Sequence, residues 1–210
     1  SLQQATGLVI GAIFVFAIAA WRLNDLALWL SMPTLAVLFF YSYCKRFTAW
    51  SHMVLGLCLG LAPVGAWIAV RGRLEWPPMI LGAAILFWVA GFDIIYATMD
   101  AEFDRKAGLH SMVQKLGVEG ALRRARQFHI AFAVLLLIFG KAASLGWLYF
   151  LAVVLIGGFL VYEHRLVRPD DLRRVNAAFF TVNGAISVFF LVVVMLEMLL
   201  HWWSSARVAS

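Results

Sequence analysis

The chain has 210 residues, of which 64% are hydrophobic and only 13% are charged, with a formal net charge of +6. Soluble globular domains mix apolar and charged residues more evenly, so this composition and a mean hydropathy of +0.90 exclude that class. We therefore expect an integral membrane protein. The positive charge indicates membrane topology and attraction to anionic headgroups, and no nucleic-acid partner is expected.

Seven stretches are long and apolar enough to cross a bilayer, since a span needs about 20 mostly apolar residues. The sequence therefore predicts an all-α, polytopic transmembrane helix bundle that forms one domain over residues 1–210. A polar, irregular segment is expected over residues 101–120, between the fourth and fifth spans. In chain order, the expected spans are 4–22, 26–43, 52–70, 77–99, 121–140, 145–162 and 176–203.

Small and polar residues inside two of the spans predict contacts between helices. Gly56, Gly60 and Gly65 in the third span would let a neighbouring backbone approach closely, as membrane helix interfaces favour small residues. Three polar residues near one stripe of the last span are expected to form hydrogen bonds to other helices. These residues are Asn176, Asn183 and Ser187.

The basic residues are distributed unevenly between the two sides of the predicted bundle. If alternate connections lie on one side, 12 of the 17 lysines and arginines lie together. The positive-inside rule then assigns that side to the cytoplasm. The 12 residues are Lys45, Arg46, Arg105, Lys106, Lys115, Arg123, Arg124, Arg126, Arg165, Arg168, Arg173 and Arg174.

The segment FDIIYATMDAEFDRKAGLHS places carboxylates at the end of the fourth span, on the same predicted side. Asp93, Asp100 and Asp104 are 7 and 11 positions apart, which returns to nearly the same angle on a continuous α-helix. Clustered carboxylates repel one another unless a cation lies among them, and Mg²⁺ uses one or two carboxylates with substrate phosphates. A solvated loop would explain Glu102. It explains Asp93 poorly, because ionisable residues inside an apolar run are costly and usually functional.

Basic residues near the same membrane surface could hold a phosphate group. Tyr41 and Lys45 are four positions apart on one helical face, with Arg46 beside them. Arg105 and Lys106 directly follow the last aspartate. Each cation alone is also expected at a cytoplasmic helix end. Together with the acidic segment they favour a diphosphate bridged by magnesium to the carboxylates.

The histidines and cysteines give weaker signals. The five histidines include no pair with the i, i+4 spacing of metal ligands, and none is predicted as a catalytic base. His110 lies in the loop after Asp104 and could contact a phosphate. Cys44 and Cys58 form no metal-ligand or disulfide pattern and are expected to be packing residues.

Several motifs resemble one known family. DIIYATMDAEFD with the following GLHS resembles the second aspartate-rich motif of the UbiA superfamily of intramembrane aromatic prenyltransferases. YSYCKRFT, which contains Tyr41 and Lys45, resembles the YxxxK element of that family. VLGLCLGLAPVGAWIAV resembles its glycine-rich span, and YEHRLVRP and NAAFFTVNG resemble its late spans. The resemblance covers essentially the whole chain and looks closest to the 4-hydroxybenzoate polyprenyltransferase branch.

The resemblance implies a fold of nine transmembrane helices with two aspartate-rich motifs. Only seven spans are predicted, and no NDxxDxxxD element precedes Tyr41. The interpretation is that residues 1–210 form an N-terminally incomplete prenyltransferase domain that lacks the first two helices. Half of the expected metal site would then be missing, and this chain alone could be inactive.

The reaction implied by the resemblance is the Mg²⁺-dependent transfer of a polyprenyl group from polyprenyl diphosphate. The acceptor would be a small aromatic compound such as 4-hydroxybenzoate, in ubiquinone or menaquinone biosynthesis. The active site would face the cytoplasm from a bacterial or archaeal cell (inner) membrane. By resemblance, the metal ligands are Asp93, Asp100 and Asp104, the catalytic residues are Asp100, Asp104, Tyr41 and Lys45, and the diphosphate-binding residues are Lys45, Arg46, Arg105 and Lys106.

Other functions remain open from the sequence. Haem, chlorophyll or archaeal lipid prenylation would use the same kind of site within the superfamily. A membrane transporter predicts paired broken helices in two related halves, and the acidic element is not repeated. Phosphatidyl-alcohol transferases also use acidic residues, but their DGxxAR motif is missing. A non-catalytic helper subunit is a further alternative.

Overall fold

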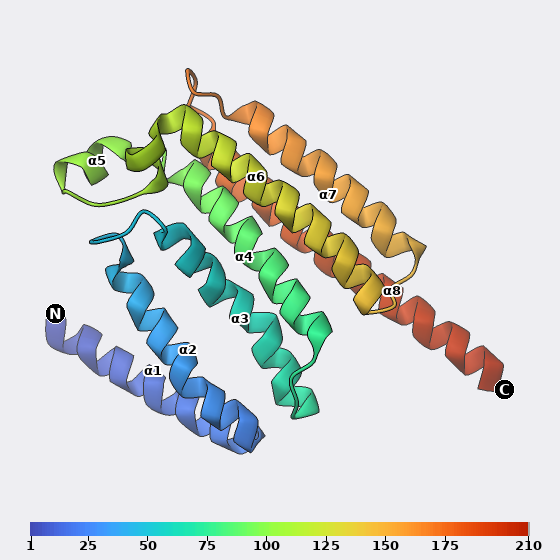
Figure 1. Cartoon of the computed structure of the whole chain (residues 1–210). Coiled ribbons are helices and arrows are strands. Elements are labelled where there is room, and N and C mark those ends of the chain that lie inside the picture. The colour runs from blue at the N-terminus through green and yellow to red at the C-terminus, as the bar shows by residue number, and fades with distance from the viewer. Residues whose placement is uncertain (210) are drawn as a thin grey trace.

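The computed structural model describes residues 1–209, with the side chains of residues 1–203. Seven of the described helices are long and apolar enough to cross a membrane, which confirms the predicted all-α bundle. The π-helix η1 and the following helix form the last span together. The elements are α1 (Leu2–Leu23), α2 (Asp25–Cys44), α3 (Ser51–Arg71), α4 (Trp76–Tyr96), α5 (Ala101–Lys106), α6 (Met112–Ala142), α7 (Trp147–Leu166), η1 (Ala177–Val182) and α8 (Asn183–Ala209) (Figure 1).

Local capping interactions explain several helix ends. Asn24 begins α2, because its side-chain oxygen accepts a hydrogen bond from the Ala27 N–H at 2.9 Å. Its amide group also donates to the Ile68 carbonyl at 2.9 Å, which ties the turn between α1 and α2 to the end of α3. Gly72 ends α3 with a positive φ of 66°, a conformation that glycine adopts without steric cost.

The centre of the bundle is α4. This helix buries eight residues, whereas α1 buries only Ala20. On one side α4 packs against α3, where Gly56 and Gly60 lie directly against its backbone. The predicted close approach at these two glycines is confirmed, but the prediction for Gly65 is wrong. Gly65 has open space beside it and lines an apolar cavity between α2 and α3.

On its other side, α4 contacts α6 and the last span, which η1 and α8 form together. Gly91 of α4 leaves room for the ring of His129, and the rings of Trp88 and Phe132 stack with their centroids 5.4 Å apart. Further along, Tyr149, Ile156 and other apolar residues from α7 join the same core. Figure 1 shows the resulting arrangement, with α1 and α2 at one edge and α6, α7 and α8 at the other.

The fourth span ends earlier than the sequence predicts. α4 stops at Tyr96, and residues 97–100 form turns in which Thr98, Met99 and Asp100 each donate to the carbonyl three positions before. Such turns advance by about 120° per residue rather than the ~100° of an α-helix. The prediction that Asp93, Asp100 and Asp104 share one continuous helical face is therefore wrong.

The segment predicted to be irregular contains helical structure. Residues 101–106 form α5, and α6 already begins at Met112, where Ser111 caps it by accepting a hydrogen bond from the Gln114 N–H at 3.2 Å. Gly117, with φ 69° and ψ 171°, interrupts the helix and lets its first turn change direction. The polar segment is thus a folded cap over one end of the bundle rather than an open loop (Figure 1).

The turn that joins α7 to η1 lies at the same end of the bundle as α5 (Figure 1). Arg173 holds both oxygens of the Asp171 carboxylate, with Nε–Oδ1 and Nη2–Oδ2 distances of 2.9 Å. These hydrogen bonds with the Arg173 guanidinium hold the pKa of the Asp171 carboxyl well below its usual range. The backbone hydrogen bonds between Arg168 and Asp171 close this turn, and the ion pair lies on its exposed side.

The backbone contact between α3 and α4 gives a direct test of the fold. We expect Gly56→Ala to lower the free energy of unfolding by about 1–3 kcal/mol, because the new Cβ meets the Leu86 carbonyl. Gly65→Ala is the matched control on the same helix, and it should be neutral or stabilising because its Cβ enters open space. Thermal unfolding in detergent measures both variants. Equal melting temperatures would contradict the packing described.

Candidate functional site

Two residues from distant parts of the sequence meet at the end of the bundle that carries α5. Lys45 caps the end of α2, and its Nζ lies 3.4 Å from Oδ2 of Asp104 in α5, 59 positions later. The backbone also joins these segments, because the His110 N–H donates to the Lys45 carbonyl at 2.7 Å. The Asp104 side chain is only 1% exposed, whereas that of Lys45 is 34% exposed. Asp104 is thus a buried anion held by a cation that still reaches solvent.

Asp93 has a different partner, which the sequence analysis did not identify. Its Oδ2 lies 2.6 Å from Nδ1 of His52 on α3, and the His52 ring is fully buried. The opposite ring nitrogen, Nε2, accepts a weak hydrogen bond from the Met112 N–H at 3.4 Å. This pattern assigns the proton to Nδ1, which donates to Asp93. His52 therefore links α3, α4 and the start of α6.

Asp100 and Tyr41 occupy half-buried positions at the same end. Asp100 begins α5, where its carbonyl accepts from the Asp104 N–H at 2.8 Å. Its carboxylate forms no hydrogen bond or ion pair with another described residue, so its oxygens are available to a ligand. Tyr41 lies on α2, one turn before Lys45.

The other predicted cations form an exposed rim around these carboxylates. The Arg46 guanidinium lies over the Tyr43 ring, 5.3 Å from its centroid. Lys106 pairs with Glu102 at 2.7 Å, and Arg105 projects into solvent. The structure therefore places Arg46, Arg105 and Lys106 at the same end of the bundle as Asp104. It brings only Lys45 into contact with a predicted metal ligand.

The carboxylates are not gathered into one preformed metal cage. Within the described residues, no group of three His, Cys, Asp or Glu side chains lies close enough to hold a metal ion. Asp93 is held by His52 and Asp104 by Lys45, while Asp100 remains available. Mg²⁺ needs only one or two protein carboxylates when substrate phosphates and water complete its shell. The oxygen donors present at Asp100 and Asp104 fit that requirement.

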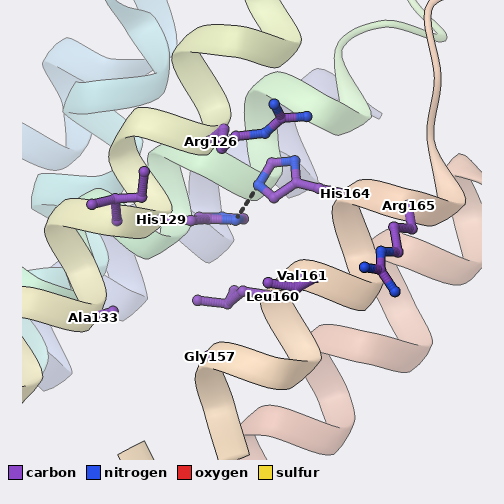
Figure 2. A pocket seen from close by; sticks show the side chains of 9 residues that line it. Arg126, His129, Ala133, Gly157, Leu160, Val161, His164 and Arg165 are labelled. Carbon is purple, nitrogen blue, oxygen red and sulfur yellow. Dashed lines mark hydrogen bonds between the residues drawn. The ribbon is translucent and has the colours of Figure 1, made fainter. Parts of the chain in front are cut away.

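A second polar cluster lies deeper in the bundle, between α4, α6, α7 and α8. Glu163 is completely buried, and its Oε1 accepts a hydrogen bond from the Asn183 amide at 3.1 Å. The Asn183 oxygen in turn accepts from the Trp88 indole at 2.9 Å. The other Glu163 oxygen lies 3.4 Å from Nδ1 of His129, which is also 3.0 Å from Nε2 of His164 (Figure 2).

This cluster partly confirms the prediction made for the last span. Asn183 does form hydrogen bonds to other helices. The prediction is wrong for Asn176 and Ser187, which are exposed, and the Ser187 hydroxyl donates to the Asn183 carbonyl within its own helix. Glu163, His129 and His164 were not identified from the sequence.

The chain is similar to known proteins in both sequence and fold. Residues 1–194 match the model of the UbiA prenyltransferase family. The chain belongs to the UbiA prenyltransferase family. This confirms the predicted resemblance. The ion pair of Lys45 and Asp104 lies within the matched region.

Three curated relatives illustrate the family branch. The chain is 27% identical to a 4-hydroxybenzoate octaprenyltransferase from Aromatoleum aromaticum over 92% of its own length and 66% of the relative's. It is 29% identical to a 4-hydroxybenzoate solanesyltransferase from Synechocystis over 96% and 68%, respectively. It is 30% identical to a 4-hydroxybenzoate octaprenyltransferase from Marinobacter nauticus over 87% and 62%. The chain thus spans about two thirds of the length of these relatives.

A solved structure supports the fold. The apo structure of a UbiA homolog from Aeropyrum pernix K1 is similar, with a TM-score of 0.84 and 30% sequence identity. The match covers 94% of this chain and 74% of that one. The helical arrangement seen in this UbiA chain is therefore that of its family.

The buried polar cluster makes a prediction about stability. Replacing Asn183 by Ala removes the partner of both Trp88 and Glu163, and unpaired buried polar groups cost about 1–3 kcal/mol. We expect Asn183→Ala to lower the free energy of unfolding by that amount. Ser187→Ala, one turn later, is the control and should change it little, since that hydroxyl bonds only within its own helix. Denaturant titration of the purified protein measures both, and equal losses would contradict the network.

Proposed function

We propose that the protein transfers a polyprenyl group from polyprenyl diphosphate to a small aromatic acceptor, with 4-hydroxybenzoate as the candidate acceptor. Family membership supports the prenyl transfer, and the names of the relatives support the acceptor. The structural observation that carries the proposal is the Lys45–Asp104 pair at one end of the apolar bundle. A buried carboxylate next to a partly exposed ammonium can bind a metal-complexed diphosphate while the prenyl chain enters the apolar interior.

The proposed diphosphate site is built from the exposed rim and the two carboxylates of α5. Lys45 is the cation best placed to contact phosphate oxygens, because it is fixed by Asp104 and still open to solvent. Arg46, Arg105 and Lys106 would add positive charge around it. Asp100 and Asp104 would hold Mg²⁺, which when bound would neutralise the diphosphate as the carbon–oxygen bond breaks.

Asp93 and Tyr41 would act at the inner side of this site. The hydrogen bond from His52 keeps the Asp93 carboxylate oriented inside the bundle, where it can support the metal ligands or the charge of the reacting carbon. Tyr41 lies on α2 one turn before Lys45, and an aromatic face attracts a cation such as an allylic carbocation. The surrounding apolar helices would exclude the water that destroys such a cation.

The orientation of the site is part of the proposal. Lys45, α5 and the turn between α7 and η1 lie at alternate helix connections. The 12 basic residues grouped by the sequence lie in these connections or in the adjoining halves of α6 and α7. The positive-inside rule supports a cytoplasmic location for this end in the cell membrane. The expectation that two further helices of the family fold precede residue 1 stays a prediction.

Variants of the ion pair test the proposed role of the site. We expect Lys45→Met and Asp104→Asn each to lower prenyl transfer by about 10²–10³-fold, because each removes charge stabilisation at the reacting diphosphate. Glu119→Gln is the control, since it changes an exposed acid whose partner is Arg123, a residue outside the proposed site, and it should stay within about twofold. Membranes containing the protein are incubated with polyprenyl diphosphate and 4-hydroxybenzoate, and the prenylated product is quantified. Where turnover is too low, binding of polyprenyl diphosphate in Mg²⁺ is compared for the same variants. Full activity or binding in Asp104→Asn would overturn the assignment.

Metal removal tests the cofactor separately. Chelation with EDTA should abolish product formation, and added Mg²⁺ should restore it. Asp100→Asn should raise the Mg²⁺ concentration needed for half-maximal activity by at least about tenfold, because it removes an oxygen donor. Product formation that persists after exhaustive chelation would contradict a metal-dependent reaction.

A further inference from the structure

A groove between α6 and α7 lies apart from the Lys45–Asp104 pair. The cavity has a volume of about 430 Å³ and is shown in Figure 2. Its walls are apolar and include Ile130 and Ala133 from α6 and Leu160 and Val161 from α7. Gly157 of α7 forms part of the wall, and a Cβ atom added there would meet no other atom within 4 Å. The groove is thus a slot wide enough for a hydrocarbon chain.

Basic residues close one end of this slot. Arg126 on α6 and Arg165 on α7 both line it, together with His164 (Figure 2). A neighbouring cavity shares these three residues and adds Arg123, Arg168 and Glu119, of which Glu119 pairs with Arg123. Neither Arg126 nor Arg165 forms an ion pair with an acidic residue in the described part of the chain. The two guanidinium groups therefore carry uncompensated charge.

The position of the groove decides which molecules can reach it. His164 and Arg165 lie in the last turn of α7, at the same end of the bundle as α5. Ile130 and Val161 are 59% and 53% exposed, so the apolar walls open sideways and not into the bundle. For a membrane-spanning helix pair, that direction faces lipid. If the positive-inside rule alone explained these two arginines, no apolar slot would be expected beside them.

We propose that this groove binds an anionic membrane phospholipid. Its phosphate group would lie between Arg126 and Arg165 at the membrane surface, and one acyl chain would run along the slot toward Gly157. Basic pockets between transmembrane helices on the cytoplasmic side are suited to acidic headgroups. The lipid would bridge α6 and α7 at the end opposite their short connecting turn. This site is separate from the proposed prenyl-transfer site, and its test does not depend on turnover.

Lipid binding to the purified chain tests the proposal. Binding of phosphatidylglycerol is measured by native mass spectrometry and by the rise in melting temperature in nanodiscs, with phosphatidylcholine as the neutral comparison. We expect the wild type to prefer phosphatidylglycerol. The variant R126Q/R165Q should bind it about 25-fold more weakly, at about fivefold for each arginine. The matched control R22Q/K141Q removes two positive charges from the opposite end of the bundle and should retain the preference.

The apolar slot is tested by a pair of adjacent glycines. Gly157→Leu fills the slot and leaves both arginines in place, so it should weaken phosphatidylglycerol binding. Gly158 does not line the groove, and a side chain there also meets open space, which makes Gly158→Leu the control for helix effects. Each variant is compared by its own lipid-induced shift, which separates binding from a general loss of stability.

Three results would overturn the proposal. One is equal binding of phosphatidylglycerol by R126Q/R165Q and R22Q/K141Q, and another is equal binding by the two leucine variants. The third is displacement of the lipid by millimolar inorganic phosphate, since this would identify a site for soluble anions and not for a lipid.

Discussion

Polar groups inside a membrane bundle must find partners within the protein, because lipid offers no hydrogen bonds, and this constraint organises the structure around α4. Trp88 is satisfied by Asn183 of α8, and Asp93 by His52 of α3. His52 also reaches the backbone at the start of α6. These few hydrogen bonds set which helices lie next to α4, while Gly56 and Gly60 determine how closely α3 approaches it.

The same constraint shapes the proposed active site. Asp104 is almost completely buried, so it needs the positive charge that Lys45 provides from α2. The short helix α5 carries this carboxylate back over the end of the bundle. Asp93 and Asp104 each have a protein partner before any substrate arrives, so Asp100 is the one of the three predicted metal ligands whose carboxylate has no partner among the described residues. In the proposed site, Mg²⁺ would therefore bind together with the diphosphate, whose oxygens would complete its coordination.

Two basic surfaces at one end of the bundle differ in what surrounds them. Lys45 lies beside the carboxylate of Asp104, and such a combination of opposite charges suits a metal-complexed diphosphate. Around Arg126 and Arg165 the neighbours are mainly apolar side chains and a histidine, which suits a phosphate joined to a hydrocarbon chain. The positive-inside rule accounts for the sign of the charge in both places. The ligand that each surface can take depends on these neighbours.

The sequence by itself determined the class, the number of spans, the polar end of the bundle and the family, because hydropathy, charge asymmetry and local motifs are properties of contiguous residues. It could not show that the fourth span ends at Tyr96, since this depends on turns whose residues are helix-compatible. It also could not pair His52 with Asp93, 41 positions away, or show that Glu163 at the end of a predicted span is buried against His129. Those contacts arise only when α3 packs against α4 and α7 packs against α6. Tertiary structure therefore decided which carboxylates have partners and which remain available to a ligand.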